Sequence, residues 1–76
     1  MSDAENTVLR NVESLLKRRN AQVQVTLDSD LSADLEMDSL EIAELSAALE
    51  EDLGSDPYSE GIFPNTIGEL VAFYST

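Results

Sequence analysis

Apolar positions recur with a helical period in three stretches of this chain, and the first stretch covers residues 3–19. Its apolar residues follow the i, i+3/i+4, i+7 spacing of an amphipathic helix. These residues are Val8, Leu9, Val12, Leu15 and Leu16. Ser2 and Glu5 can cap the start of this helix. The run Lys17-Arg18-Arg19 suits the negative end of the helix dipole, with Asn20 as the stop, so helix termination explains the basic run without a ligand.

The second stretch, residues 39–53, predicts the clearest helix. Leu45, Leu49 and Leu53 are spaced by four and form the expected core stripe. The acidic side chains should then face water. They are Glu41, Glu44, Glu50, Glu51 and Asp52. Gly54 is the expected C-cap, and the acids of the last turns oppose the helix dipole there, which suggests another use for their charge.

The third stretch predicts a closing helix from Thr66 to Tyr74, with a Thr66–Glu69 capping box. Several of its side chains should face the core. They are Ile67, Leu70, Val71 and either Phe73 or Tyr74. Before this helix, Asp56-Pro57 opens a turn, and residues 58–63 are expected to be irregular or briefly helical.

Residues 20–37 lack a helical repeat. Gln22 to Thr26 alternate like a strand, but the chain offers no second strand to pair with them, so a long loop is the prediction. Five apolar side chains should pin this loop to the core. They are Val23, Val25, Leu27, Leu31 and Leu35. Asp30 to Asp34 can form a single helical turn.

The predicted fold is therefore all-α and occupies one domain, residues 1–76. It is a four-helix bundle of three main helices and one short helix, with a long first loop. The chain has no cysteine or histidine, which excludes disulfides, thiolate metal sites and the commonest general base. No apolar run reaches the roughly 18 residues of a membrane span, and the acidic N-terminus does not resemble a signal peptide. A monomer in the cytoplasm is expected.

The charge is strongly asymmetric. Sixteen acids against four bases give a net charge of −12, and no base follows Arg19. Nucleic acid and anionic membranes are excluded as expected partners, because a polyanion binds through cations that displace its counterions. Basic protein surfaces are the expected partners, and plain solubility is the alternative explanation of the charge.

Ser39 lies where the long loop becomes the second helix. Asp38 or Ser39 can cap that helix, and Glu41 completes a capping box with Asp38. A nucleophilic serine needs a base or a strained glycine-flanked elbow, and neither accompanies Ser39. Residue 42 is isoleucine, so a Ser-x-x-Lys arrangement is also absent. No catalytic residue is predicted, and any chemistry at Ser39 must be performed by another protein.

The acidic residues from Asp30 to Glu41 raise the question of a calcium-binding site. Oxygen-bearing side chains occupy six positions with the spacing of an EF-hand loop. They are Asp30, Ser32, Asp34, Glu36, Asp38 and Glu41. Leu35 replaces the glycine of the sharp turn and the preceding segment is β-branched, so no metal site is predicted. An enzyme with paired carboxylates is also not expected, because no aromatic-lined pocket is evident in a chain with four aromatic residues.

The motif around Ser39 resembles the modification motif and second helix of acyl carrier proteins. The resemblance extends over nearly the whole chain and combines helix order, length, acidity and leucine spacing. The stretches that carry it are Asp38-Ser39-Leu40, Glu41-Ile42-Ala43-Glu44-Leu45, Ala48-Leu49-Glu50-Glu51-Asp52-Leu53, the loop pairs Asp30-Leu31 and Asp34-Leu35, and Asn65-Thr66-Ile67-Gly68-Glu69-Leu70.

The resemblance implies that Ser39 receives 4′-phosphopantetheine from coenzyme A through a separate phosphopantetheinyl transferase. It also implies partner enzymes, such as an acyltransferase, a ketosynthase or other tailoring enzymes, whose basic patches recognise certain positions of the chain. These positions are the acidic Asp38, Glu41, Glu44, Glu50 and Glu51 and the exposed apolar Leu40 and Ala47. The implied function is a discrete, non-enzymatic carrier of acyl thioesters in polyketide or fatty-acid-type biosynthesis.

The chain departs from the family pattern at three positions. Glu36 replaces a glycine that commonly precedes the aspartate by two residues, and Ser46 and Ala47 stand where larger apolar residues are frequent. Small residues there imply either more room for an acyl chain or a different packing. The pair Met37-Asp38 favours an acyl carrier over an aminoacyl or peptidyl carrier of nonribosomal synthesis. An unmodified acidic helical interaction module is the alternative from another class.

Overall fold

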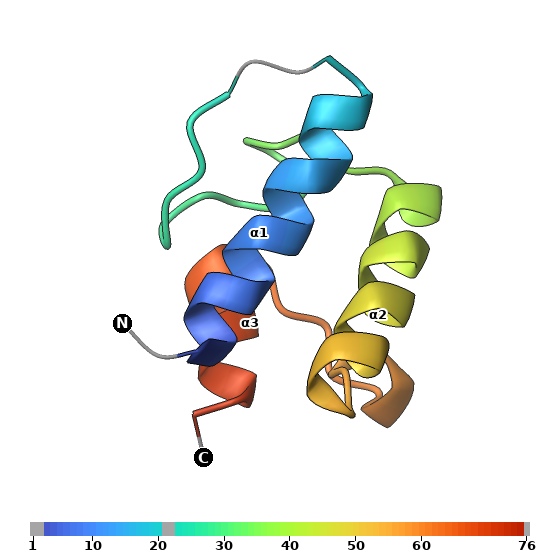
Figure 1. The fold of residues 1–76 in the computed structure, drawn as a ribbon. Coiled ribbons are helices and arrows are strands. Elements are labelled where there is room, and N and C mark those ends of the chain that lie inside the picture. Colours follow the sequence, from blue (N-terminus) through green and yellow to red (C-terminus); the bar gives the residue numbers. More distant parts are fainter. Residues whose placement is uncertain (1–2, 21–22, 76) are drawn as a thin grey trace.

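The computed structural model describes residues 3–20 and 23–75 and confirms the all-α prediction (Figure 1). Its elements are α1 (Asp3–Arg18), α2 (Ser39–Leu53), the short 3₁₀ helix η1 (Tyr58–Glu60) and α3 (Ile67–Phe73). The three main helices lie within one residue of the predicted bounds, and η1 is the predicted short fourth helix. The part of the chain that the structure describes contains no strand.

Each predicted helix end has the backbone conformation that its residue favours. Asn20 ends the first helical segment with φ of 59°, and Gly54 caps α2 with φ of 83°, both in the left-handed region. Thr66 caps α3, and its capping box with Glu69 is present. The predicted cap at Ser2 lies outside the described residues.

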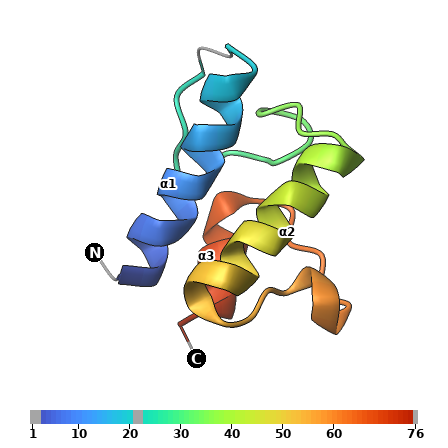
Figure 2. The ribbon, with the colours of Figure 1, turned by 45° about the vertical axis from the view of Figure 1, so that its right-hand side comes forward.

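The core forms where α1 packs against both α2 and α3. Figure 2 shows α2 running beside α1, with α3 behind the two. The predicted core positions of α1 are buried, with Leu9 packing at the margin. Leu45 and Leu49 are fully buried, whereas Leu53 is only partly buried at the end of the stripe. The remaining buried apolar side chains come from the loop and α3: Leu31, Leu35, Met37, Ile67, Leu70 and Val71.

The long loop is held partly by side chains and partly by backbone. Leu31 and Leu35 are buried and Val25 packs against the core, as predicted. The prediction was wrong for Val23 and Leu27, which are 43% and 44% exposed. Leu27 instead anchors the loop through its carbonyl, which accepts a 2.8 Å hydrogen bond from the Gly68 N–H.

Gly68 permits this close approach of the loop to α3. A Cβ at this position would lie 3.0 Å from the Leu27 carbonyl oxygen. Two more backbone bonds fix the same crossing, from the Ile67 N–H to the Ser29 carbonyl and from the Leu31 N–H to the Asn65 carbonyl. The loop is therefore attached to the start of α3 before it turns back toward α2, which fixes the approach of the chain to Ser39.

Candidate functional site

Ser39 is the first residue of α2, and its side chain is exposed. The capping function belongs to its neighbour Asp38, whose Oδ1 accepts a 2.9 Å hydrogen bond from the Glu41 N–H. Glu41 Oε1 in turn accepts from the Asp38 N–H at 3.4 Å, which completes the predicted capping box. The Ser39 hydroxyl makes no hydrogen bond to any residue that the structure describes. This serine is therefore free for another group.

The backbone around Ser39 suits an anion. The N–H groups of Ser39 and Leu40 have no acceptor within residues 3–20 and 23–75. They lie at the positive end of a helix of 15 residues, where unpaired N–H groups and the helix dipole favour a phosphate. A phosphodiester on the Ser39 oxygen would thus fit the hydroxyl exposure and the local field.

The loop residues before Ser39 alternate between buried and exposed positions. Leu35 and Met37 are buried, and the Met37 N–H donates a 2.9 Å bond to the Leu31 carbonyl. Glu36, between them, is exposed and has φ of 53°. The glycine-like backbone conformation is thus present although the residue is glutamate, and an L-residue adopts it at a cost of roughly 1–2 kcal/mol.

The first two turns of α2 are tied to the end of α1. Arg19 Nε lies 3.1 Å from Glu41 Oε2, and Arg18 forms an ion pair with Glu44. The prediction that Glu41 and Glu44 point only to water was wrong, because both are half-buried under these pairs. Arg19 and Arg18 are 22 and 26 residues away from Glu41 and Glu44 in sequence, so the helical repeat of α2 could not predict these pairs.

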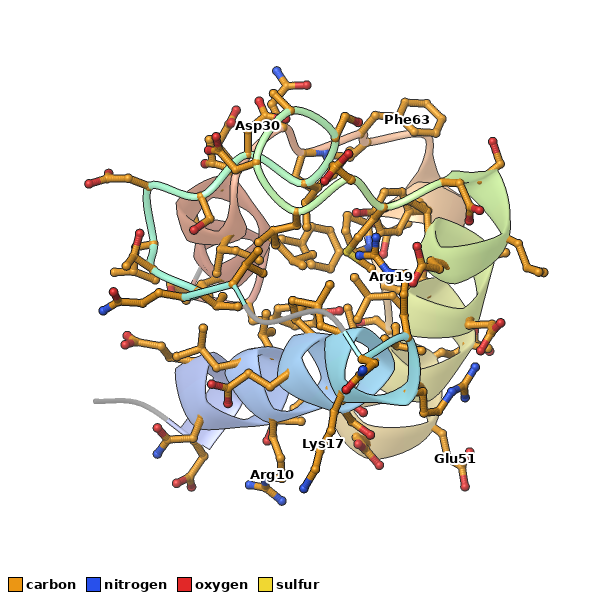
Figure 3. The ribbon with its side chains drawn as sticks, turned by 90° about the horizontal axis from the view of Figure 1, so that it is seen from above. Arg10, Lys17, Arg19, Asp30, Glu51 and Phe63 are labelled. Carbon is orange, nitrogen blue, oxygen red and sulfur yellow. The ribbon has the colours of Figure 1, made fainter. Side chains whose placement is uncertain are left out.

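The other predicted recognition residues lie on the surface of α2. Leu40 is 68% exposed, and Ala47, Glu50 and Glu51 are exposed as well. In Figure 3 the Glu51 side chain points away from the bundle. Asp52 is also exposed but accepts a 3.0 Å hydrogen bond from the Asn11 amide of α1. An acidic and apolar surface thus follows α2 from Ser39 toward its C-terminus.

The acids of the EF-hand-like spacing serve the loop backbone. Asp30 Oδ1 accepts from the N–H groups of Ser32 and Ala33, and Asp34 Oδ2 accepts from the Asp30 N–H. The Asp34 N–H also bonds to the Asp30 carbonyl, which is the predicted single helical turn. In the part of the chain that the structure describes, no three acidic side chains are arranged to hold a metal ion.

Beyond the far end of α2, the structure contains a buried carboxylate that the sequence analysis did not identify. Asp56 is 1% exposed and accepts hydrogen bonds from the hydroxyls of Ser46 and Ser59 and from the Ser59 N–H. Burial raises the pKa of Asp56, but the hydrogen bonds that its carboxylate accepts, together with an interaction with the Glu50 side chain, outweigh burial and hold the pKa below its ordinary value of 3.8. Asp56 follows the C-cap of α2 and precedes a proline, and in the sequence this position predicts a turn and gives no sign of burial.

Two tyrosines lie near this carboxylate. The pKa of Tyr58 and of Tyr74 is raised to about 12 each. The larger cause is burial, which disfavours the charged phenolate, and the next is repulsion of the phenolate by the Asp56 carboxylate. The Tyr74 hydroxyl donates a 2.8 Å bond to the Ser55 carbonyl, whereas the buried Tyr58 hydroxyl has no partner among the described residues. An open groove of about 630 Å³ adjoins Tyr74. It is lined by Leu53, Ser55, Glu60, Ile62, Phe73 and Tyr74, so it starts where α2 ends and lies away from Ser39.

Comparison with known proteins identifies one family. A family model described as a phosphopantetheine attachment site matches residues 6–74. The chain has no significant match to a curated protein or to a solved structure. None of the helices within residues 3–20 and 23–75 is long and apolar enough to span a membrane.

Proposed function

We propose that this chain, which belongs to the phosphopantetheine attachment family, carries acyl intermediates of polyketide or fatty-acid-type biosynthesis on Ser39. Family membership makes it a carrier domain with covalently attached 4′-phosphopantetheine. When bound, this group supplies a terminal thiol that holds acyl groups as thioesters, in a chain that itself contains no cysteine.

The observation that carries the assignment to Ser39 is its free, exposed hydroxyl at the start of α2. Asp38 performs the capping, so modification of Ser39 breaks no hydrogen bond to a described residue. The free N–H groups of the first turn stabilise the charge of a phosphodiester on that oxygen. These two features separate Ser39 from a serine that serves only as a cap.

The surface of α2 supports the proposed partners. A phosphopantetheinyl transferase and the later acyltransferase or ketosynthase each need access to Ser39. The adjacent Leu40 offers them an apolar contact, and Glu50 and Glu51 offer exposed carboxylates to basic patches. We infer that the chain works as a monomer in the cytoplasm and that these visiting enzymes perform all the chemistry.

The test is incubation of the purified chain with coenzyme A, magnesium and a broad-specificity phosphopantetheinyl transferase, followed by mass spectrometry. The expected result is one added phosphopantetheine mass, located on Ser39 by peptide fragmentation. S39A should remain unmodified, and S32A, which alters another exposed serine of the same region, should be modified like the parent. Absence of the added mass from the folded parent chain would overturn the proposal.

Loading the modified chain distinguishes the acyl carrier from the aminoacyl or peptidyl carrier. The holo form is offered malonyl groups by an acyltransferase and amino acids by an adenylating enzyme, and each thioester is detected by its mass. We expect malonyl loading, because Met37-Asp38 precedes Ser39 in the manner of acyl carriers. Loading with amino acids alone would assign the chain to the nonribosomal class.

A further inference from the structure

Arg19 makes contacts on both sides of the turn that presents Ser39. Its Nη2 donates a 2.6 Å hydrogen bond to the Leu35 carbonyl, and its Nη1 lies 3.4 Å from the Glu36 carbonyl. Its Nε forms the 3.1 Å ion pair with Glu41 in the first turn of α2. One guanidinium, at the end of α1, therefore joins the loop before Ser39 to the helix after it.

The residues that Arg19 contacts are those whose conformation fixes Ser39. Glu36 holds the left-handed backbone that is costly for an L-residue. Glu41 forms the capping box with Asp38, directly before Ser39. The Glu41 side chain is only 15% exposed and the Arg19 side chain 34% exposed, so this ion pair is better shielded from solvent than a fully exposed surface pair.

Arg18 provides a matched comparison within the same chain. It carries the same charge and pairs with Glu44, one helical turn after Glu41, but it forms no hydrogen bond or ion pair with the described residues of the loop. Its side chain is 64% exposed. Figure 3 shows Arg19 directed toward the space between α1 and the loop that leads into α2, whereas Arg10 and Lys17 point away from the other elements.

We propose that Arg19 is a positioning residue that holds residues 35–41 in the conformation in which a transferase modifies Ser39. This inference rests on the proposed function and deepens it. Glu41 then serves mainly the internal structure of the site, and a partner enzyme reads the carboxylates farther along α2. Without Arg19, the strained loop has other conformations available, and only a fraction of the molecules presents Ser39 correctly.

If Arg19 acted only through its charge, its loss should change the KM of phosphopantetheine transfer in the opposite direction to the loss of a positioning contact. Loss of Arg19 makes the chain more acidic and frees Glu41, so a basic transferase that is only attracted by charge should bind the variant more tightly. Loss of a positioning contact should weaken productive binding instead, since the apparent affinity falls with the fraction of competent molecules. The direction of the change in KM therefore distinguishes the two effects.

The experiment compares R19A, R19K, R18A and the parent chain in transfer of phosphopantetheine to Ser39, at a temperature where urea denaturation shows each to be folded. We expect R19A to raise KM on the order of tenfold with little change in kcat. R18A should stay within about twofold of the parent, as exposed pairs contribute little. R19K retains the charge but not the fork of donors, so its KM should lie between those of R19A and the parent.

Amide hydrogen exchange gives a readout that does not depend on modification. In the unmodified chain, R19A should accelerate exchange of the Met37 and Glu41 amides relative to buried amides of α1, whereas R18A should not. A KM of R19A equal to or below that of R18A, or unchanged exchange at residues 35–41, would overturn the positioning role. A parent chain that is never modified at Ser39 contradicts the proposed function instead, so the two failures are distinguishable.

Discussion

The Ser46 hydroxyl donates a 2.7 Å hydrogen bond to Asp56 Oδ1 and thereby joins the middle of α2 to the turn that follows it. This contact explains why a serine stands at a helix position where large apolar residues are frequent in acyl carrier proteins. The site is filled by a carboxylate with its donors, so the small side chain at this position reflects a different packing and not extra room.

Replacing Ser46 tests the strength of this contact. S46A removes one donor to a buried carboxylate, at a cost of about 1.5–3 kcal/mol, and gains about 0.5 kcal/mol of helix propensity. We expect the free energy of unfolding to fall by about 1–2.5 kcal/mol in urea denaturation. S32A, at an exposed serine whose hydroxyl has no partner among the described residues, should change it by under about 0.5 kcal/mol. Equal effects of the two substitutions would contradict this interpretation.

The lowered pKa of Asp56 makes the stability depend on pH in a defined direction. Its stabilising effect is fully present above the unfolded-state pKa of about 3.9 and is lost as the pH falls through the lower folded-state pKa. D56N should therefore be less stable than the parent near neutral pH, and the gap should close in acid. Urea denaturation of both chains from about pH 7 to about pH 2 measures it. A gap independent of pH would show that the Asp56 pKa is not lowered.

Tyr58 and Tyr74 form a natural pair for measuring the value of a buried hydroxyl. Y74F removes a hydrogen bond to the Ser55 carbonyl and should lower the free energy of unfolding by about 0.5–1.5 kcal/mol. Y58F removes a hydroxyl that is buried without a described partner, so it should leave stability unchanged or raise it by up to about 1 kcal/mol. Thermal or urea unfolding checks both variants. A loss of stability in Y58F as large as that in Y74F would indicate a partner for its hydroxyl.

Helix bounds and caps could be predicted from the sequence because they depend on neighbouring residues. The spacing of Leu45 and Leu49, the Asp38–Glu41 capping box and Gly54 are all local signals, and the structure confirms each. The position of Ser39 at the start of α2 follows from the same signals.

Contacts between distant segments could not be predicted in this way. The pairing of Arg19 with Glu41 depends on how α1 and α2 pack, and the burial of Asp56 depends on Ser46, ten residues earlier on another element. The exposure of Leu27 could not be predicted for the same reason, because its carbonyl and not its side chain binds α3, through a backbone hydrogen bond. Hydrophobicity patterns do not report backbone hydrogen bonds between distant segments.

The left-handed backbone at Glu36 predicts that glycine is the preferred residue there. Comparison of E36G with E36A isolates the backbone effect, because both lose the side chain. Glycine avoids a cost of roughly 1–2 kcal/mol but adds about 0.4–1 kcal/mol of chain entropy to the unfolded state, so E36G should be more stable by about 0.5–1 kcal/mol. Urea denaturation measures the difference. At Ser32, where φ is not positive, S32G should be less stable than S32A, and the same order at both positions would contradict the explanation.

Charge reversal on α2 tests how partner enzymes reach Ser39. Glu44 is already paired with Arg18. Glu50 is exposed and interacts with Asp56 but has no ion pair with a described residue, so reversal of its charge breaks no ion pair. We expect E50K to lower kcat/KM for delivery to a basic partner enzyme by about three- to tenfold at low salt, and to reduce its dependence on ionic strength. The fold should tolerate the change, since a cation suits the C-terminal turns of a helix.

D28K provides the matched control for E50K. Asp28 is an exposed acid of the long loop, so D28K changes the net charge by the same amount while leaving α2 intact. If docking depends on the position of the carboxylate, D28K should stay within about twofold of the parent chain at every ionic strength tested. If E50K and D28K slow delivery equally, the partner responds only to the overall negative charge, and the acids of α2 would serve solubility and general attraction instead of a defined docking contact.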